Sequence, residues 1–210
     1  MTTFDNRKDF PQHPWVAASL DFCMRPMRRL RPKLLAAASG RVLEVGCGTG
    51  MNFDCYAGIE SLAAVEPDPH MLRRARVKAE GLPYPARLEQ AGAEDLPFDD
   101  DSFDTAVLTW VLCTIAQPQA AVAEVLRVLR PGGRLIYAEH TRAKGRLAAS
   151  MQDGLTPLWK KLAGGCHLNR DSVAMLAEAG FVDFSCRPAG SESWNLVPVY
   201  TGTATKPYLP

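Results

Sequence analysis

The sequence of 210 residues lacks several patterns that would place it in other classes of protein. Its six cysteines form no C-x-x-C pair, which argues against zinc ribbons and thioredoxin-like motifs. No apolar run approaches the roughly 18 residues needed to cross a bilayer. A net charge of +1 gives no general reason to expect nucleic acid as a partner. We therefore expect a cytoplasmic protein with reduced thiols and no transmembrane segment.

Two common phosphate-binding patterns are also missing from the one glycine-rich stretch, RVLEVGCGTGMN at residues 41–52. It has neither the Gly-Lys-Ser/Thr of a P-loop nor the third glycine of G-x-G-x-x-G. An aliphatic run followed by Gly46, Gly48 and Gly50 still predicts a strand and a loop with bare backbone, the usual place for a nucleotide-like cofactor. Glu44 would repel a pyrophosphate but attract the ammonium and sulfonium groups of S-adenosylmethionine. The loop, including Cys47, therefore predicts an S-adenosylmethionine site.

Alternating strand and helix patterns predict an α/β fold. We expect a Rossmann-like, seven-stranded, mostly parallel sheet with helices on both faces and an antiparallel last strand. Residues 1–40 are predicted to form a helical segment that packs over the cofactor site, and residues 41–210 the cofactor-binding domain, with a helical insertion at about 141–169. The predicted strands are residues 41–45, 60–65, 86–91, 103–109, 134–139, 181–187 and 195–204.

Further cofactor contacts are expected where the next strands end. Glu66, followed by Pro67, ends the second strand about 20 residues after the glycine loop, where a carboxylate can accept hydrogen bonds from ribose hydroxyls. In the loop at residues 92–98, the Ala93 amide and the carboxylate of Glu94 or Asp95 could contact the adenine, and we favour Glu94.

The fourth and fifth strands end in residues that could line the cofactor or acceptor site. Thr109 and Trp110 end the fourth strand, and Trp110 fits either the wall of a pocket or the core. His140, at the end of the fifth strand, and His167, after the insertion, are candidate catalytic residues that could face the methyl group. Cys113 fits a small buried side chain. We expect no metal site, because Cys166 and His167 have no third ligand at useful spacing.

Taken together, these motifs resemble a class I S-adenosylmethionine-dependent methyltransferase. The segments VLEVGCGTG, AEDLPFDDDSFD and VLRVLRPGGRLIYAEH are similar to the ubiquinone/menaquinone C-methyltransferase-like superfamily over residues 41–140. Further segments, CGTGMNFDCY, the residues from LTWVLCTIAQ onward and GCHLNRDS, resemble the methyltransferase-like alkyl thiol S-methyltransferases over about residues 41–180. The resemblance implies cofactor contacts for Glu44, Gly46, Gly48, Gly50, Asn52, Glu66 and Glu94. It also places the insertion, with Trp159 and Cys166, beside the acceptor.

Three functions remain open at this point. The preferred one is S-methylation of a small thiol, for which His140 or His167 would stabilise a thiolate or accept its proton. The second is N- or C-methylation of a phospholipid or quinone-like acceptor, which the basic residues between Arg25 and Lys33 favour through contact with a membrane surface. The third is an inactive protein that binds the cofactor and serves as a partner. The sequence does not indicate an oligomeric state.

Overall fold

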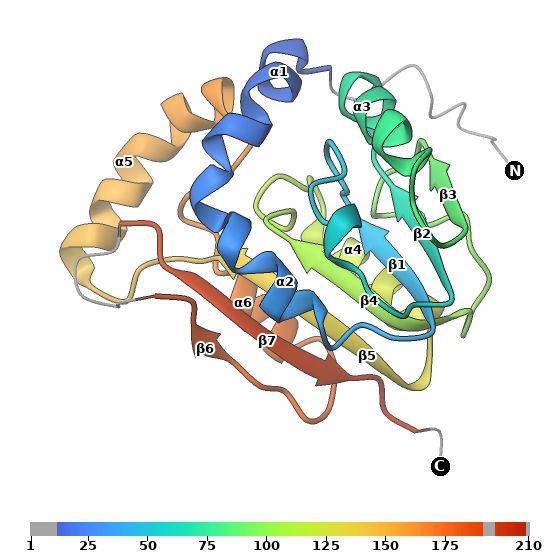
Figure 1. Ribbon diagram of the computed structural model, residues 1–210. Helices are drawn as coiled ribbons and strands as arrows, with labels where there is room; N and C mark the ends of the chain where they lie inside the picture. The colour runs from blue at the N-terminus through green and yellow to red at the C-terminus, as the bar shows by residue number, and fades with distance from the viewer. Residues whose placement is uncertain (1–11, 191–195, 209–210) are drawn as a thin grey trace, which may run out of the picture.

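A computed structural model describes residues 12–190 and 196–208. The expected N-terminal segment and last strand therefore lie partly outside the described residues, at 1–11 and at 195. Figure 1 shows a twisted sheet with helices against both faces. In chain order the elements are α1 (Pro14–Cys23), η1 (Arg25–Arg29), α2 (Arg31–Leu35), β1 (Arg41–Val45), η2 (Phe53–Cys55), β2 (Ser61–Val65), α3 (Pro69–Ala79), β3 (Ala86–Glu89), β4 (Phe103–Thr109), α4 (Pro118–Val128), β5 (Leu129–His140), α5 (Arg146–Leu162), α6 (Ser172–Ala177), β6 (Arg187–Pro188) and β7 (Val199–Thr205).

The strand order, β3-β2-β1-β4-β5-β7-β6, confirms the predicted fold class. Strands β1 to β5 pair in parallel, while β7 runs antiparallel between β5 and β6. The order reverses direction at β1 and β4, so the loops after these two strands lie at the switch point, where open α/β sheets bind ligands.

A hydrophobic core covers each face of the sheet. On one face Val125 of α4 and Leu176 of α6 pack with Tyr137 of β5. On the other face Leu35 of α2 packs with Val42 and Ile136 from the strands. Both faces of the central strands are thus buried, which explains why β4 reads as a nearly continuous apolar run.

Local signals set several boundaries correctly. Helix α3 begins at Pro69, and the Asp68 carboxylate accepts hydrogen bonds from the amides of His70 and Met71, as expected of an N-cap. Gly180, with φ of 91°, follows α6 as the predicted C-terminal glycine.

Several predicted strands differ from the structure, and a single 3-10 turn, Phe53–Cys55, follows the glycine loop. The last strand, predicted from 195, begins at Val199. Strand β5 begins at Leu129 rather than at 134, because Leu129 pairs with Phe103 of β4 and hydrogen bonds with Lys206 hold Gly132 and Gly133 in between. Strand β6 has two residues where seven were expected. Within the described ranges, no helix is both long and apolar enough to span a bilayer.

Candidate active site

The glycine loop after β1 has a backbone that other residues would strain. Gly46, Gly48 and Gly50 have φ of 68°, 56° and 75°. A Cβ on Gly46 would overlap Cγ2 of Val111, which lies in the loop after β4. The amides of Gly46 and Cys47 both donate to the Val65 carbonyl at the end of β2. The path of the loop is therefore set by backbone contacts and requires glycine at these positions.

Glu66 joins this loop to the end of β2, as its position in the sequence predicts. One carboxylate oxygen accepts from the Gly48 amide at 2.8 Å and the other from the Asp68 amide at 2.9 Å. Burial raises the pKa of Glu66 to about 7, although both amides oppose the change. Each oxygen keeps a second lone pair, so the carboxylate has the capacity to accept ribose hydroxyls as well.

Glu44 lies at the centre of a buried polar network under the loop. Its oxygens accept from the Tyr56 hydroxyl at 2.7 Å and from Asn52 Nδ2 at 3.0 Å. Asn52 also donates to Thr109 Oγ1 and accepts from Arg31. Burial raises the pKa of Glu44 to about 7, against the hydrogen bond of Tyr56 and the charge of Arg31. Both Glu44 oxygens thus have protein partners, and its direct contact with a cofactor stays a prediction.

The network contains two residues that sequence reasoning missed. Arg31 comes from α2 and is almost fully buried, with its guanidinium carbon 4.9 Å from the centre of the Trp110 ring. Tyr56 follows the loop in a stretch without helical periodicity. Trp110 itself has φ of 54° and is half-buried beside the core on the α2 face, so its ring contacts both this core and Arg31. Arg31 is distant in sequence from the residues that it contacts, so residue spacing did not indicate this contact. The only signal in the sequence was its position in a basic helix.

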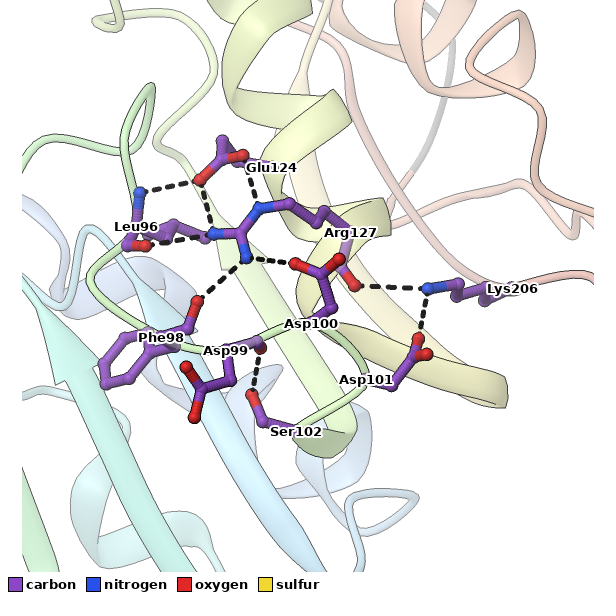
Figure 2. Close-up of polar contacts among 9 residues, drawn as sticks. All are labelled: Leu96, Phe98, Asp99, Asp100, Asp101, Ser102, Glu124, Arg127 and Lys206. Atoms are coloured by element: carbon purple, nitrogen blue, oxygen red, sulfur yellow. Dashed lines mark hydrogen bonds and ion pairs between the residues drawn. The ribbon is translucent and has the colours of Figure 1, made fainter.

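The loop after β3 is fixed from one side by Arg127 of α4 (Figure 2). Arg127 donates to the carbonyl oxygens of Leu96 and Phe98 at 3.0 and 2.9 Å. It also pairs with Glu124, whose carboxylate accepts from the Leu96 amide at 2.8 Å. The predicted adenine contact Glu94 lies just before this clamp, and its carboxylate accepts from the Gln117 amide at 3.2 Å. Arg127 therefore holds the end of the loop that positions Glu94.

Helix α1 lies against the glycine loop. Asp21 of α1 accepts a hydrogen bond from the Thr49 hydroxyl and forms an ion pair with Arg74 of α3 at 3.0 Å. A Cβ on Gly48 would lie 3.2 Å from Leu20, which shows how closely the helix approaches the loop. The expectation that the N-terminal segment closes over a bound cofactor stays a prediction.

The two candidate catalytic histidines lie in different surroundings. His140 Nε2 is 3.2 Å from Cys166 Sγ, and both lie close to Cys113 Sγ. His167 stands outside this group, with its amide and Nδ1 both close to the Cys113 carbonyl oxygen. The structure thus brings His140 together with two cysteines from other segments, a meeting that the sequence did not reveal. The expectation of no metal site considered Cys166 with His167, whereas the structure groups Cys166 with Cys113 and His140.

Electrostatics distinguish the two cysteines of this group. A hydrogen bond from Cys113 and the adjacent imidazole lower the pKa of the Cys166 thiol to about 4, against the effect of burial. The hydrogen bond to Cys166 and burial raise the pKa of Cys113. For His140, burial alone would lower the pKa, but Cys166 outweighs it and the pKa is raised. Among the described residues, neither His140 Nδ1 nor Glu139 Oε2 has a hydrogen-bond partner.

A short chain of contacts connects this group with the glycine loop. Val111 lies against Gly46, and its amide donates to Glu139 Oε1 at 2.9 Å. Glu139 precedes His140 in β5, so the cysteines and histidine lie at the same edge of the sheet as the glycine loop. A separate surface groove lies between η1 and β7, with Met27, Leu30 and Pro198 in its lining, and contains none of the predicted site residues.

Comparison with known proteins agrees with these features. A family model described as a methyltransferase domain matches residues 43–137. The human thiol S-methyltransferase TMT1A is 34% identical over 179 residues, covering 81% of this chain and 73% of the relative. The human thiol S-methyltransferase TMT1B is 37% identical over 155 residues, covering 71% of this chain and 64% of the relative. A phosphatidylethanolamine N-methyltransferase from Cereibacter sphaeroides is 38% identical over 125 residues, covering 58% and 62%. The chain therefore spans a little under two thirds of the length of some of these relatives.

Solved structures share the fold at lower sequence identity. The N-methyltransferase NodS from Bradyrhizobium japonicum, determined in complex with S-adenosyl-L-homocysteine, has a TM-score of 0.65. It is 16% identical, and the match covers 87% of both chains, so this likeness shows the fold alone. The family follows from the similarity to TMT1A over most of both chains, together with the glycine loop and Glu66. The chain belongs to the class I S-adenosylmethionine-dependent methyltransferases.

Proposed function

We propose that the protein transfers the methyl group of S-adenosylmethionine to a small-molecule thiol. The observation that carries the cofactor assignment is the hydrogen bond between the Glu66 carboxylate and the Gly48 amide. It supports Glu66, beside the glycine loop, as the acceptor for ribose hydroxyls. The similarity to relatives named as thiol S-methyltransferases supports the choice of acceptor.

The residues present fit the cofactor. The loop has left-handed backbone at three glycines, and a Cβ on each would lie 3.2 Å or less from the side chain of Val111, Leu20 or Phe53, so this backbone path requires glycine. We assign Gly46, Gly48, Gly50 and Glu66 to the amino acid and ribose portions of the ligand. Cys47, Asn52, Pro67, Thr109 and Trp110 complete the predicted set around them, and Ala93 and Glu94 are assigned to the adenine. When bound, the cofactor supplies an electrophilic methyl group on a sulfonium.

The protein's own task is to orient the acceptor and manage its proton. A thiol reacts as the thiolate, and its ordinary pKa of about 8.5 leaves most of it protonated at neutral pH. His140 is buried and has an unpartnered Nδ1, and His167 lies next to Cys113. We propose that one of these histidines accepts the thiol proton. Alignment of the acceptor can contribute about 7–11 kcal/mol in favourable cases.

Purified protein with methyl-labelled cofactor and a panel of simple alkyl and aryl thiols tests the proposal. We expect label in the thioether product and a rate that falls sharply in the variant carrying both His140→Ala and His167→Ala. Binding of S-adenosylhomocysteine, measured by calorimetry, controls for the fold of the variant. Transfer to no thiol would refute the acceptor class, and an unchanged rate in the double variant would refute the proton role.

A second candidate function is methylation of a lipid or quinone-like acceptor, and one observation favours it. Helix α5 exposes an apolar stripe at every third or fourth residue, with side chains 43% to 72% exposed. The stripe consists of Leu147, Met151, Leu155, Leu158 and Leu162. Its C-terminal end lies beside the start of α1, where Trp15 is 85% exposed (Figure 1). An apolar helix face of this kind, with basic residues nearby, is typical of helices that lie in a membrane interface.

Sedimentation with anionic vesicles tests this second function. We expect binding that weakens with added salt and is lost when Leu155 and Leu158 are both changed to Glu. Ser150→Glu, which adds a charge on the exposed polar side of α5, is the matched control and should bind as the original protein does. If the protein binds vesicles of no composition, the lipid acceptor is refuted.

The third possibility, an inactive cofactor-binding protein, predicts binding of S-adenosylmethionine without transfer to any acceptor. We also propose that the reaction takes place in the cytoplasm, since all six cysteines are free, as expected in a reducing compartment.

A further inference from the structure

Three soft ligand side chains meet at the carboxyl edge of the sheet. Cys113 follows β4, His140 ends β5 and Cys166 follows α5, so the group is assembled from three separate segments. The two sulfur atoms and the nearest imidazole nitrogen all lie within 4.8 Å of one another. Cys113 and His140 are buried, and Cys166 is partly buried.

The spacing suits a tetrahedral metal ion. Zinc binds cysteine sulfur at about 2.3 Å and histidine nitrogen at about 2.0–2.1 Å, which places tetrahedral ligands about 3.5–3.8 Å apart. The Nε2 of His140 and Sγ of Cys166 are 3.2 Å apart, so small shifts of the side chains would admit the ion. Two thiolates would also balance the charge of the ion inside the protein, leaving no net charge buried.

We propose that Cys113, His140 and Cys166 bind a zinc ion through three protein ligands, and that the open fourth position takes the sulfur of the acceptor thiol. Three protein ligands and one exchangeable position are typical of catalytic rather than structural zinc sites. The part of this inference that concerns the acceptor rests on the proposed thiol methylation. In this arrangement His140 is a metal ligand, and a thiol coordinated to the ion needs no separate histidine to accept its proton.

The group lies near the glycine loop. Val111 lies against Gly46, and its amide donates to Glu139, the residue before His140, so both the group and the loop lie at the carboxyl edge of the sheet. Arg170 lies close by, with its guanidinium bound to the carbonyls of Leu112 and Ile115, and its charge helps to offset that of Glu139 and an added thiolate. Trp159 of α5 donates a side-chain hydrogen bond to Cys166.

The transfer step balances with no further reagent. The acceptor thiol loses its proton to solvent when its sulfur coordinates the ion. A lone pair of that sulfur then forms the new bond to the methyl carbon while the carbon–sulfonium bond breaks, and its electron pair stays on the departing sulfur. The products are the methyl thioether and S-adenosylhomocysteine. A neutral thioether is a weaker ligand than a thiolate and leaves the ion.

Metal binding is measured first, without any reaction. Protein freed of metal with a chelator is titrated with Zn²⁺ against a chromophoric chelator and, separately, with Co²⁺ while the absorption spectrum is recorded. We expect one ion per chain and, with cobalt, the intense bands of a tetrahedral site with thiolate ligands. Cys113→Ser or Cys166→Ser should weaken binding by more than the roughly 10- to 100-fold typical of changes outside the ligand set. Cys23→Ser, an exposed cysteine outside the group, is the control.

The outcomes separate this inference from the proposed function. Absence of metal binding by protein that still binds S-adenosylhomocysteine would overturn the site, as would equal binding by the two cysteine variants. If metal binds and added thiol leaves the cobalt spectrum unchanged, the open position is refuted. If metal-free protein methylates thiols at the full rate, the metal's part in the reaction is refuted while the proposed function stands. If metal binds, thiol changes the spectrum and no thiol is methylated, the proposed function fails instead.

Discussion

Gly46 offers the sharpest test of how the cofactor loop is built. Its φ of 68° would cost an L-residue about 1–2 kcal/mol. A Cβ there would also overlap Val111 Cγ2 and lie 3.1 Å from Val111 Cβ, and forced overpacking typically costs about 1–3 kcal/mol. We therefore expect Gly46→Ala to lower the free energy of unfolding by about 2–5 kcal/mol, as measured by urea denaturation without cofactor.

A matched glycine separates the two causes. Gly58 has nearly the same φ, 69°, but a Cβ there would meet nothing within 4 Å. Gly58→Ala should therefore cost only the conformational part, about 1–2 kcal/mol, and leave the affinity for S-adenosylhomocysteine unchanged. Gly46→Ala should weaken that affinity as well.

A double-mutant cycle tests the overlap directly. Val111→Ala removes the methyl groups in the way, so in the Gly46→Ala background it should destabilise less than it does alone, by about 1 kcal/mol or more. Additive effects of the two substitutions, or equal losses in Gly46→Ala and Gly58→Ala, would refute the idea that Val111 shapes the loop.

Three further predictions concern the buried charges. Burial raises the pKa of Glu66 to about 7 in the folded state, from an unfolded value near 4.5, so the folded state stays protonated at this residue to higher pH. The free energy of unfolding should therefore fall by up to about 3 kcal/mol as pH rises from 4.5 to 7. Glu66→Gln should flatten that part of the curve in urea titrations, and a curve of unchanged slope would refute it. Tyr56→Phe should cost about 1–3 kcal/mol, since it leaves a buried oxygen of Glu44 without its donor; a neutral change in thermal unfolding would contradict this. Arg127→Met should lower the free energy of unfolding by about 2 kcal/mol and weaken cofactor binding, because Arg127 holds the loop after β3. Arg130→Met, which breaks an exposed ion pair, should lower it by less than about 1 kcal/mol in the same denaturation assay. Equal losses of stability would contradict the role of Arg127 in holding the loop.

The features that the sequence predicted well were local. The glycine loop, the Asp68 cap and the central strand at 103–109 depend on residues within a few positions of one another, and the structure has each where expected. Glu66 lies on the glycine loop because β1 and β2 pair in parallel with their carboxyl ends together. This placement follows from fold class alone.

The features that the sequence did not predict depend on contacts between distant segments. Strand β5 extends to Leu129 because Leu129 pairs with Phe103 of β4, 26 positions earlier in the chain. Arg31 joins the network of Glu44 from a helix that precedes the sheet. Cys113 meets His140 and Cys166 across 27 and 53 positions of the chain, a distance over which residue spacing carries no information. Such groups become visible only when the strands are placed side by side.

Calorimetric titration with S-adenosylhomocysteine, with NAD as the control ligand, tests the central claim most directly. We predict one binding site per chain for S-adenosylhomocysteine, clear weakening by Glu66→Gln, and no binding of NAD, because the loop lacks the third glycine of the dinucleotide-binding pattern. Binding of NAD in preference to S-adenosylhomocysteine, or binding of neither by folded protein, would contradict the assignment of the glycine loop to S-adenosylmethionine.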